Sequence, residues 1–333
     1  MRSSIVGIAH NRPLAPGQPD WESSADVLVQ VEAIEGALME LGHQAVRLPL
    51  DRDAGDFIAR LRDCRAGVVV NLCESVDDDP MLIGHPAALL ELLGVPFTGS
   101  SSLALAMSTD KLLAKRLFKA ANLRTPAYFC YDGGPVPRPL GLNPPLILKP
   151  RFQDASIGID QDSVITSTRG LAEKLRDFHG RYGPLLVEEY LPGREFNVSL
   201  FGYPLPRILP VAEIDFADFP AGLFPIVGYR AKWDSSAPEY HTTRRVFPGH
   251  LPPSLLWSIR QVAKECFDLF GLRDYGRVDL RVDERGRPCV LEVNANPCLS
   301  PDAGFPAAVS QTGMSYRDMV RDLLHFCGKR GES

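Results

Sequence analysis

Tyr275-Gly276-Arg277-Val278-Asp279-Leu280-Arg281-Val282 and Cys289-Val290-Leu291-Glu292-Val293-Asn294 are the two stretches that decide the fold. Both are rich in β-branched residues, and a polar connection with a glycine, residues 283–288, joins them. This pattern predicts an antiparallel hairpin. If the strands pair symmetrically about the connection, Val282 faces Cys289 and Asp279 faces Glu292. Side chains alternate across a strand, so the polar residues of both strands share one face.

This shared face carries a charge pattern that needs an explanation. Glu292 and Asn294 lie on it, with Asp279 and Arg277 opposite them on the partner strand. Two carboxylates that face each other repel, which makes physical sense if a hard cation lies between them. Mg²⁺ prefers a few carboxylate or amide oxygens together with substrate phosphates. The alternative is a solvated hairpin face with incidental acidic residues.

A cation that favours phosphates directs attention to elements that bind anions. Lys149 ends an apolar strand at residues 146–150, where its ammonium would be desolvated unless it met an anion. Residues 154–159, which include Ser156, form a small-residue loop whose backbone N–H groups can hold phosphate, and Lys111 adds a further positive charge. Each signal alone is also typical of a surface lysine. Walker A and G-x-G-x-x-G motifs are absent, which argues against a P-loop or a Rossmann site.

A further segment suits a nucleotide base. Glu188-Glu189-Tyr190-Leu191 ends a strand and is followed by Pro192-Gly193-Arg194-Glu195. In a site built between lobes, backbone groups at 189–191 would read an adenine edge and Glu195 would accept ribose hydroxyls. The alternative is a strand with polar decoration.

The order of elements indicates three parts. Predicted strands at 4–9, 45–50 and 66–72 alternate with helices at 25–41, 57–61 and 86–93, which favours a parallel sheet covered by helices. A Lys-rich helix at 109–121 and a proline-rich surface linker at 133–145 follow. Strands at 145–149, 162–166 and 185–189 around a helix at 169–178 predict a small α+β lobe. The remainder alternates strands at 196–201, 210–214, 277–282 and 289–294 with helices at 255–270 and 316–326.

Composition excludes several classes of protein. The 333 residues carry 36 Lys+Arg and 41 Asp+Glu, a net charge of −5, which argues against nucleic acid or an anionic membrane surface as a partner. No apolar run approaches the roughly 20 residues that cross a bilayer, and the start of the chain is too short for a signal peptide. Seven cysteines without C-x-x-C spacing argue against a disulfide framework and a zinc knuckle, and favour the cytoplasm.

Together these motifs resemble the ATP-grasp superfamily, and within it the D-alanine:D-alanine ligase family. The likeness covers nearly the whole chain in the right order. Pro96-Phe97-Thr98-Gly99-Ser100 with Asp110-Lys111 resembles the family's linker into the central lobe. Gly276-Arg277-Val278-Asp279 with Leu291-Glu292-Val293-Asn294-x-Asn296-Pro297 is the most specific match.

The resemblance implies an α/β ATP-grasp fold with an N-terminal lobe at 1–110, a central lid lobe at 111–190 and a C-terminal lobe at 191–333. The nucleotide would lie between the last two. It also implies roles for individual residues. Those that would bind ATP are Lys111, Lys149, Ser156, Glu188, Glu189, Tyr190, Leu191 and Glu195. Asp279, Glu292 and Asn294 would hold two magnesium ions, with Mn²⁺ as a substitute. Arg277 would stabilise the reacting oxyanion, and Lys232, in a closing loop at 229–233, would point at the γ-phosphate.

The implied reaction phosphorylates a carboxylate with ATP and lets an amine attack the acylphosphate. The substrates would be two amino acids, or an amino acid and a small acid. Two alternatives stay open: an ester-forming ligase of the same fold and a non-catalytic ATP-binding relative. A homodimer would follow the resemblance.

The chain departs from the family where the amino acids would bind. A hydrogen-bonded trio of glutamate, serine and tyrosine is replaced by Ala155 and Trp233, with Glu22 or Asp26 in place of the glutamate. The serine that grips the second amino acid falls near Ala303, and a histidine is replaced at Cys73-Glu74. Nucleotide and metal positions persist while both pockets change, which favours ATP-dependent ligation and argues against D-alanine.

Overall fold

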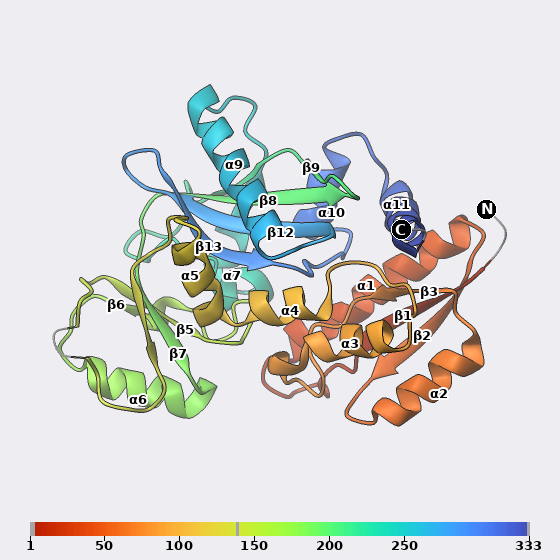
Figure 1. The fold of residues 1–333 in the computed structure, drawn as a ribbon. Coiled ribbons are helices and arrows are strands. Elements are labelled where there is room, and N and C mark those ends of the chain that lie inside the picture. Colours follow the sequence, from red (N-terminus) through yellow and green to blue (C-terminus); the bar gives the residue numbers. More distant parts are fainter. Residues whose placement is uncertain (1–3, 138–139, 332–333) are drawn as a thin grey trace.

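A computed structural model describes residues 4–137 and 140–331 of the chain. Its strands form three sheets, in agreement with the three predicted lobes (Figure 1). The first sheet lies at the lower right of the view, the second at the lower left, and the third spans the top. The boundaries at 110/111 and 190/191 stay predictions.

The N-terminal sheet is parallel, as predicted, with the order β2-β1-β3. Its strands are β1 (Ile5–Asn11), β2 (Gln44–Leu50) and β3 (Val68–Asn71). The helices that accompany them are α1 (Trp21–Glu40), α2 (Ala54–Cys64), α3 (Gly84–Leu92) and the 3-10 turn η1 (Pro80–Leu82). Helix α1 starts four residues before the predicted residue 25.

The Lys-rich helix predicted at 109–121 is wrong in its start. Two helices occupy this region, α4 (Ser102–Thr109) and α5 (Lys111–Ala120), and Asp110 between them is extended. The Asp110 carboxylate accepts hydrogen bonds from the N–H groups of Leu112 and Leu113 and so caps α5. The cap breaks a run whose composition alone reads as continuous helix.

The lid sheet is antiparallel, with the order β4-β7-β5-β6. It contains β4 (Tyr128–Tyr131), β5 (Leu146–Pro150), β6 (Val164–Ile165) and β7 (Leu185–Glu189), with η2 (Gln161–Ser163) and α6 (Leu171–Tyr182). Side chains of α6 and the sheet form a separate apolar core. The proline-rich stretch 133–145 is not wholly on the surface, because Leu142 is buried in that core. Its Pro139 lies outside the described residues.

The third sheet is antiparallel and builds the floor of the site. Its order is β11-β10-β8-β12-β13, and β9 pairs with β8. The strands are β8 (Arg194–Gly202), β9 (Arg207–Ile208), β10 (Ala212–Asp215), β11 (Arg244–Val246), β12 (Asp274–Val282) and β13 (Pro288–Asn294). The helices are α7 (Tyr229–Trp233), α8 (Pro238–Thr242), α9 (Pro253–Leu269), α10 (Gly304–Ser310) and α11 (Tyr316–Gly331). Helix α9 packs on the apolar face of the sheet.

The predicted hairpin is confirmed, but its register near the turn is not. Val282 faces Pro288 and not Cys289, because the turn is one residue shorter than predicted. The Asp283 carboxylate closes this turn by accepting the N–H groups of residues 285 and 287. A bulge at Leu291 restores the predicted pairing farther on, so that Asp279 faces Glu292.

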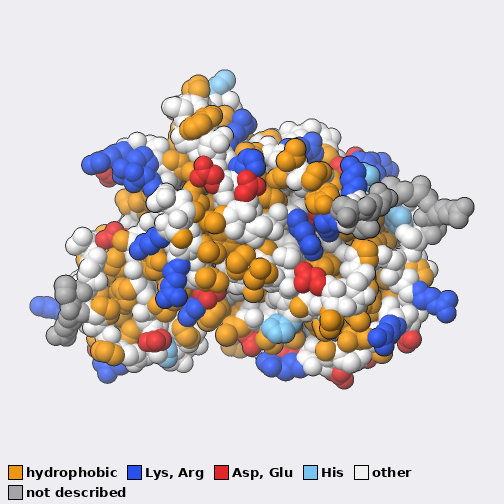
Figure 2. Space-filling view, viewed as in Figure 1, with side chains coloured by type: hydrophobic (Ala, Val, Ile, Leu, Met, Phe, Trp, Pro, Cys, Tyr) orange, Lys and Arg blue, Asp and Glu red, His pale blue; other side chains and the backbone are white. Residues whose placement is uncertain are grey.

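Two apolar side chains stand out on the surface. Leu92 on α3 and Leu103 on α4 are exposed, the two helices contact each other, and apolar side chains gather over this region in Figure 2. The homodimer stays a prediction. Within residues 4–137 and 140–331, no helix is long and apolar enough to span a membrane.

Gly193 lies between β7 and β8, where the lid lobe joins the third sheet, and a substitution there tests how closely the backbone packs at this connection. Its φ is +126°, and a Cβ built on it would lie 2.2 Å from the carbonyl oxygen of Val282. We expect Gly193→Ala to lower the free energy of unfolding by about 2 kcal/mol or more. Gly36→Ala in α1, where no atom lies within 4 Å, is the control and should be neutral or slightly stabilising. Equal urea midpoints for the two variants would contradict the assignment.

Candidate active site

The polar face of the third sheet holds an arginine and a carboxylate in direct contact. Arg277 donates two hydrogen bonds to Asp279, with N···O distances of 2.8 and 2.9 Å. Asn197 of β8 donates a third to the same carboxylate at 2.8 Å. Burial raises the pKa of Asp279, and Arg277 opposes that rise. The pair fixes the guanidinium in place on the sheet.

Glu292 lies opposite Asp279 and differs from it in its contacts. Among the described residues it has no hydrogen-bond or ion-pair partner. Burial opposes its ionisation, but cationic groups around it lower its pKa to about 2. These groups are Lys111, Lys149, Lys232 and Arg277. Glu292 is therefore an ionised carboxylate that the protein leaves available for a ligand.

The donor set fits a hard cation that is shared with a ligand. In the described part of the chain, no three side chains of His, Cys, Asp or Glu converge as a metal site. The predicted set is instead two carboxylates, Asp279 and Glu292, and the amide of Asn294, which opposes Arg277 on the same face. These donors are too few to complete the coordination shell of a metal ion. Mg²⁺ sites in proteins usually have this property when the ion also binds substrate phosphates.

Next to this face lies a buried charge triad. Lys115 and Lys149 contact the two oxygens of Glu188, at 2.6 and 2.8 Å. Lys115 and Glu188 are each 1% exposed, whereas Lys149 is 13% exposed. Burial lowers the pKa of Lys115, while Glu188 raises that of Lys149 against its own burial. Two ammonium groups and one carboxylate give the triad a net charge of +1. Its most accessible member is Lys149.

Lys115 is a residue that the sequence analysis did not select. It also donates to Thr125 Oγ1 at 2.7 Å and to the carbonyl of Leu291 at 2.9 Å. Leu291 is the bulged residue next to Glu292, so Lys115 joins the lid sheet to the bulge of β13. Its position one turn after Lys111 on a helix with a strong apolar face was the available signal.

The predicted adenine segment lies at the end of β7. The N–H groups of Glu189 and Tyr190 already donate to the carbonyls of Ala127 and Pro145. Arg281, also missed, donates to the Leu191 carbonyl at 2.8 Å and to Glu195 at 2.9 Å. Burial disfavours the charge on Arg281, but Glu195 and Tyr190 together outweigh burial and raise the pKa of the guanidinium. The carboxylate of Glu195 is therefore already paired with Arg281.

The small-residue loop and the closing loop are bonded to each other. Ala155 and Ser156 have φ of 54° and 64°, and the Ser156 hydroxyl donates to the Val227 carbonyl at 2.7 Å. Trp233 Nε1–H donates to the Ala155 carbonyl at 2.9 Å. An indole–backbone hydrogen bond therefore ties the closing loop to the small-residue loop.

Two predicted lysines flank this closed loop. Lys111 Nζ lies 3.2 Å from Asp154 and bonds the Gln153 carbonyl. Lys232 is exposed to solvent, yet the protein around it and the charge of Arg277 lower its pKa. Lys232 has no hydrogen-bond partner among the described residues.

Two acidic side chains, Asp26 and Glu74, lie near each other, and Gln30 donates a hydrogen bond to each of them. Asp26 accepts hydrogen bonds from Cys298 at 3.0 Å and Ser300 at 3.2 Å, whereas Glu22 is exposed. Gln30 donates to Glu74 at 2.8 Å. Burial, with a smaller contribution from Asp26, raises the pKa of Glu74 to about 7.

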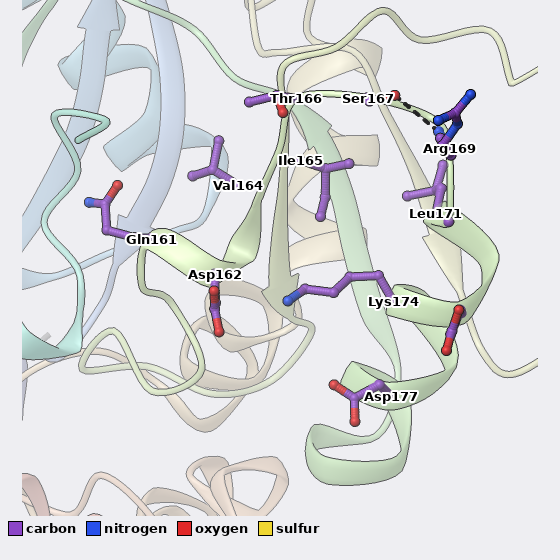
Figure 3. Close-up of a pocket in the computed structure, with 12 residues that line it drawn as sticks. Gln161, Asp162, Val164, Ile165, Thr166, Ser167, Arg169, Leu171, Lys174 and Asp177 are labelled. Carbon is purple, nitrogen blue, oxygen red and sulfur yellow. Dashed lines mark hydrogen bonds between the residues drawn. The ribbon is translucent and has the colours of Figure 1, made fainter. Parts of the chain in front are cut away.

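A groove on the lid lobe is separate from the candidate site. It has a volume of about 520 Å³ and lies between β6 and α6 (Figure 3). Asp162, Arg169 and Lys174 line it, and none of the predicted site residues does.

Comparison with known proteins agrees with this geometry. Residues 140–325 match the family model described as D-ala D-ala ligase C-terminus. A D-alanine–D-alanine ligase of Bordetella pertussis is 34% identical over 240 residues, 71% of each chain. An uncharacterized protein of Sinorhizobium fredii is 29% identical over 90% of this chain and 87% of its own. The crystal structure of a D-alanine–D-alanine ligase from Bacillus anthracis, complexed with ATP, superposes with a TM-score of 0.78 at 18% identity over 99% of both chains.

The three-lobed fold is therefore an ATP-grasp fold. The chain belongs to the D-alanine–D-alanine ligase family.

The raised pKa of Glu74 predicts a pH dependence of stability. The native state holds the proton more tightly than the unfolded chain, so stability falls as pH rises from about 4.5 to about 7. Glu74→Gln removes this loss. We expect the melting temperature of the variant minus that of the native chain to grow from pH 5 to pH 8. A difference that is constant with pH would contradict the assignment.

Lys115→Met tests the buried triad. Because Glu188 loses one of two buried counter-charges, we expect the free energy of unfolding to drop by about 3 kcal/mol or more. Lys119→Met, an exposed lysine on the same helix whose ammonium lies over the Tyr128 ring, should lower it by no more than about 1 kcal/mol. The double variant Lys115→Met with Glu188→Gln should recover part of the loss. If the effects of the two substitutions on the free energy of unfolding, measured in urea, were additive in the double-mutant cycle, the two charges would not be coupled.

Proposed function

We propose that this protein is an ATP-dependent ligase that joins a carboxylate to an amine through an acylphosphate. The observation that carries the proposal is Glu292. It is an ionised carboxylate opposite Asp279, with four cationic groups around it and with no hydrogen-bond or ion-pair partner in the described part of the chain. A cleft that gathers this much positive charge beside oxygen donors suits a polyphosphate with its cation.

The phosphates would meet cations from two lobes. The Lys115–Glu188–Lys149 triad has a net charge of +1, and only Lys149 reaches the cleft. Lys115 therefore neutralises Glu188, which leaves Lys149 for an anion. Lys111 and Lys232 add charge from the lid helix and the closing loop. Glu188 to Leu191 and Glu195 remain the proposed surroundings of the adenosine.

The reaction that suits these groups has two steps. A carboxylate oxygen attacks the γ-phosphorus of ATP and ADP leaves; the amine nitrogen then attacks the acyl carbon, phosphate leaves, and the amine loses a proton. Arg277, fixed by Asp279, offsets the negative charge on the acyl oxygen. When bound by Asp279, Glu292 and Asn294, magnesium neutralises phosphate charge.

The closing loop protects the intermediate from water. The Trp233–Ala155 and Ser156–Val227 bonds hold residues 227–233 against the small-residue loop. A closed site limits hydrolysis of an acylphosphate. A binding protein without turnover has no need for this combination of lid, paired arginine and metal donors, which disfavours the non-catalytic alternative.

The substrates we infer are two amino acids, or an amino acid and a small acid. Two of the three relatives named above are D-alanine–D-alanine ligases, but in this chain Asp26, Glu74 and Trp233 form contacts that depart from the family pattern. We place the reaction in the cytoplasm, where ATP is available and free cysteine thiols, seven in this chain, stay reduced.

The test is phosphate release from ATP, with and without Mg²⁺, across single and paired amino acids and small acids. Mass spectrometry of the products accompanies it. We expect release that needs one particular pair and a product one water lighter than their sum. Fragmentation then separates an amide from an ester. ATP binding without release in any mixture would support the non-catalytic relative instead.

Glu292→Gln tests the metal assignment. We expect a loss of at least about a hundredfold in kcat, because one of three oxygen donors loses its charge. The melting temperature at pH 7 should also fall, because the cationic groups that lower the pKa of Glu292 lose their counter-charge, so activity is compared at a temperature where both proteins are folded. Glu284→Gln, on the exposed turn of the same hairpin, is the control and should retain full activity. Native turnover by Glu292→Gln would remove this carboxylate from the metal set.

A further inference from the structure

Arg245 lies on the same face of the third sheet as the candidate catalytic residues. It pairs with Ile214 of β10, Ile214 pairs with Glu195 of β8, and Glu195 pairs with Arg281 of β12. Residues paired directly across neighbouring strands point to one face of a sheet. Arg281, Asp279 and Arg277 are two residues apart along β12, so they share this face with Arg245.

Arg245 differs from the other arginines of strands β11 and β12. Arg277 pairs with Asp279, Arg281 with Glu195, and Arg244 with Asp218. Among the described residues, Arg245 has no carboxylate within ion-pair distance. Its Nη1 donates to the Asp302 carbonyl at 3.0 Å, which leaves most of its donors free.

The surroundings of Arg245 keep it in place but accessible. The backbone approaches it closely at Gly304, where a Cβ would lie 3.4 Å from Nε. The side chain is still exposed, so a ligand can reach it. Partial burial, and then the charge of Arg277, lower the pKa of its guanidinium. A guanidinium that is held in place, is influenced by the charge of a second guanidinium and lacks a carboxylate of its own is poised for an anion.

Arg245 lies on a strand distant from that of Arg277, so the group it binds differs from the reacting carboxylate. In the sheet order, β11 is three strands from β12, roughly 14 Å at the usual spacing. The carboxylate that reacts is assigned to Arg277. When two amino acids are joined, the donor's other group is an ammonium, whereas the acceptor reacts through its amine and keeps its carboxylate.

We propose that Arg245 is a specificity-determining residue that binds the non-reacting carboxylate of the acceptor substrate. The inference rests on the proposed function and names one chemical requirement of that site. A planar guanidinium takes a carboxylate with two parallel hydrogen bonds. An acceptor with this carboxylate is therefore selected over an amine of the same size without it.

The experiment compares an acceptor amino acid with its carboxamide, in the native chain and in Arg245→Gln. We expect Arg245→Gln to raise KM for the acid at least about tenfold, with kcat within twofold and KM for the amide unchanged. Arg244→Gln is the matched control: it is adjacent on β11, points to the other face by alternation, and should change neither KM.

An equal rise for acid and amide, or no change for either, would overturn the role of Arg245. If the native chain forms no product with any acceptor, the proposed function fails separately. Calorimetric titration of the same acid and amide then decides the inference. Tighter binding of the acid that Arg245→Gln abolishes supports it, and equal or absent binding of the two overturns it.

Discussion

The pairing of Asp279 with Glu292 across β12 and β13 is the constraint on which the site depends. Two opposed carboxylates on one sheet face are unfavourable without compensating charge. The chain compensates them from three directions: Arg277 beside Asp279, Lys149 and Lys111 from the lid side, and Lys232 from the closing loop. The bulge at Leu291 secures this pairing, because it restores the register that the short turn has shifted.

The same charges tie the lobes together. Lys115 contacts Glu188 of the lid sheet and the carbonyl of Leu291 at the bulge. The proposed surroundings of the nucleotide and the proposed metal donors are thus joined by the buried ammonium of Lys115. Arg281 links the Leu191 carbonyl to Glu195 in a similar way. The residues that are proposed to bind the substrate are therefore held in place by Lys115 and Arg281, which are themselves buried.

The sequence alone predicted the part of the site in which side-chain positions follow from the alternation along a strand. Alternation placed Arg277, Asp279, Glu292 and Asn294 on one face, and the fold and family are confirmed. Register near the turn was wrong, because side-chain capping by Asp283 shortens the turn without a signal in the apolar pattern. Lys115, Arg281 and Arg245 were missed for a different reason. Their roles come from partners 57 to 176 residues away in the sequence, and such contacts leave no local pattern.

Transfer of oxygen from the substrate carboxylate to phosphate tests the central claim most directly. A donor acid labelled with ¹⁸O in both carboxylate oxygens is turned over with ATP, and the released phosphate is analysed by mass spectrometry. The acylphosphate route transfers one labelled oxygen, so we predict one ¹⁸O in each phosphate and one in the product. Unlabelled phosphate alongside product would contradict activation of the carboxylate by phosphorylation.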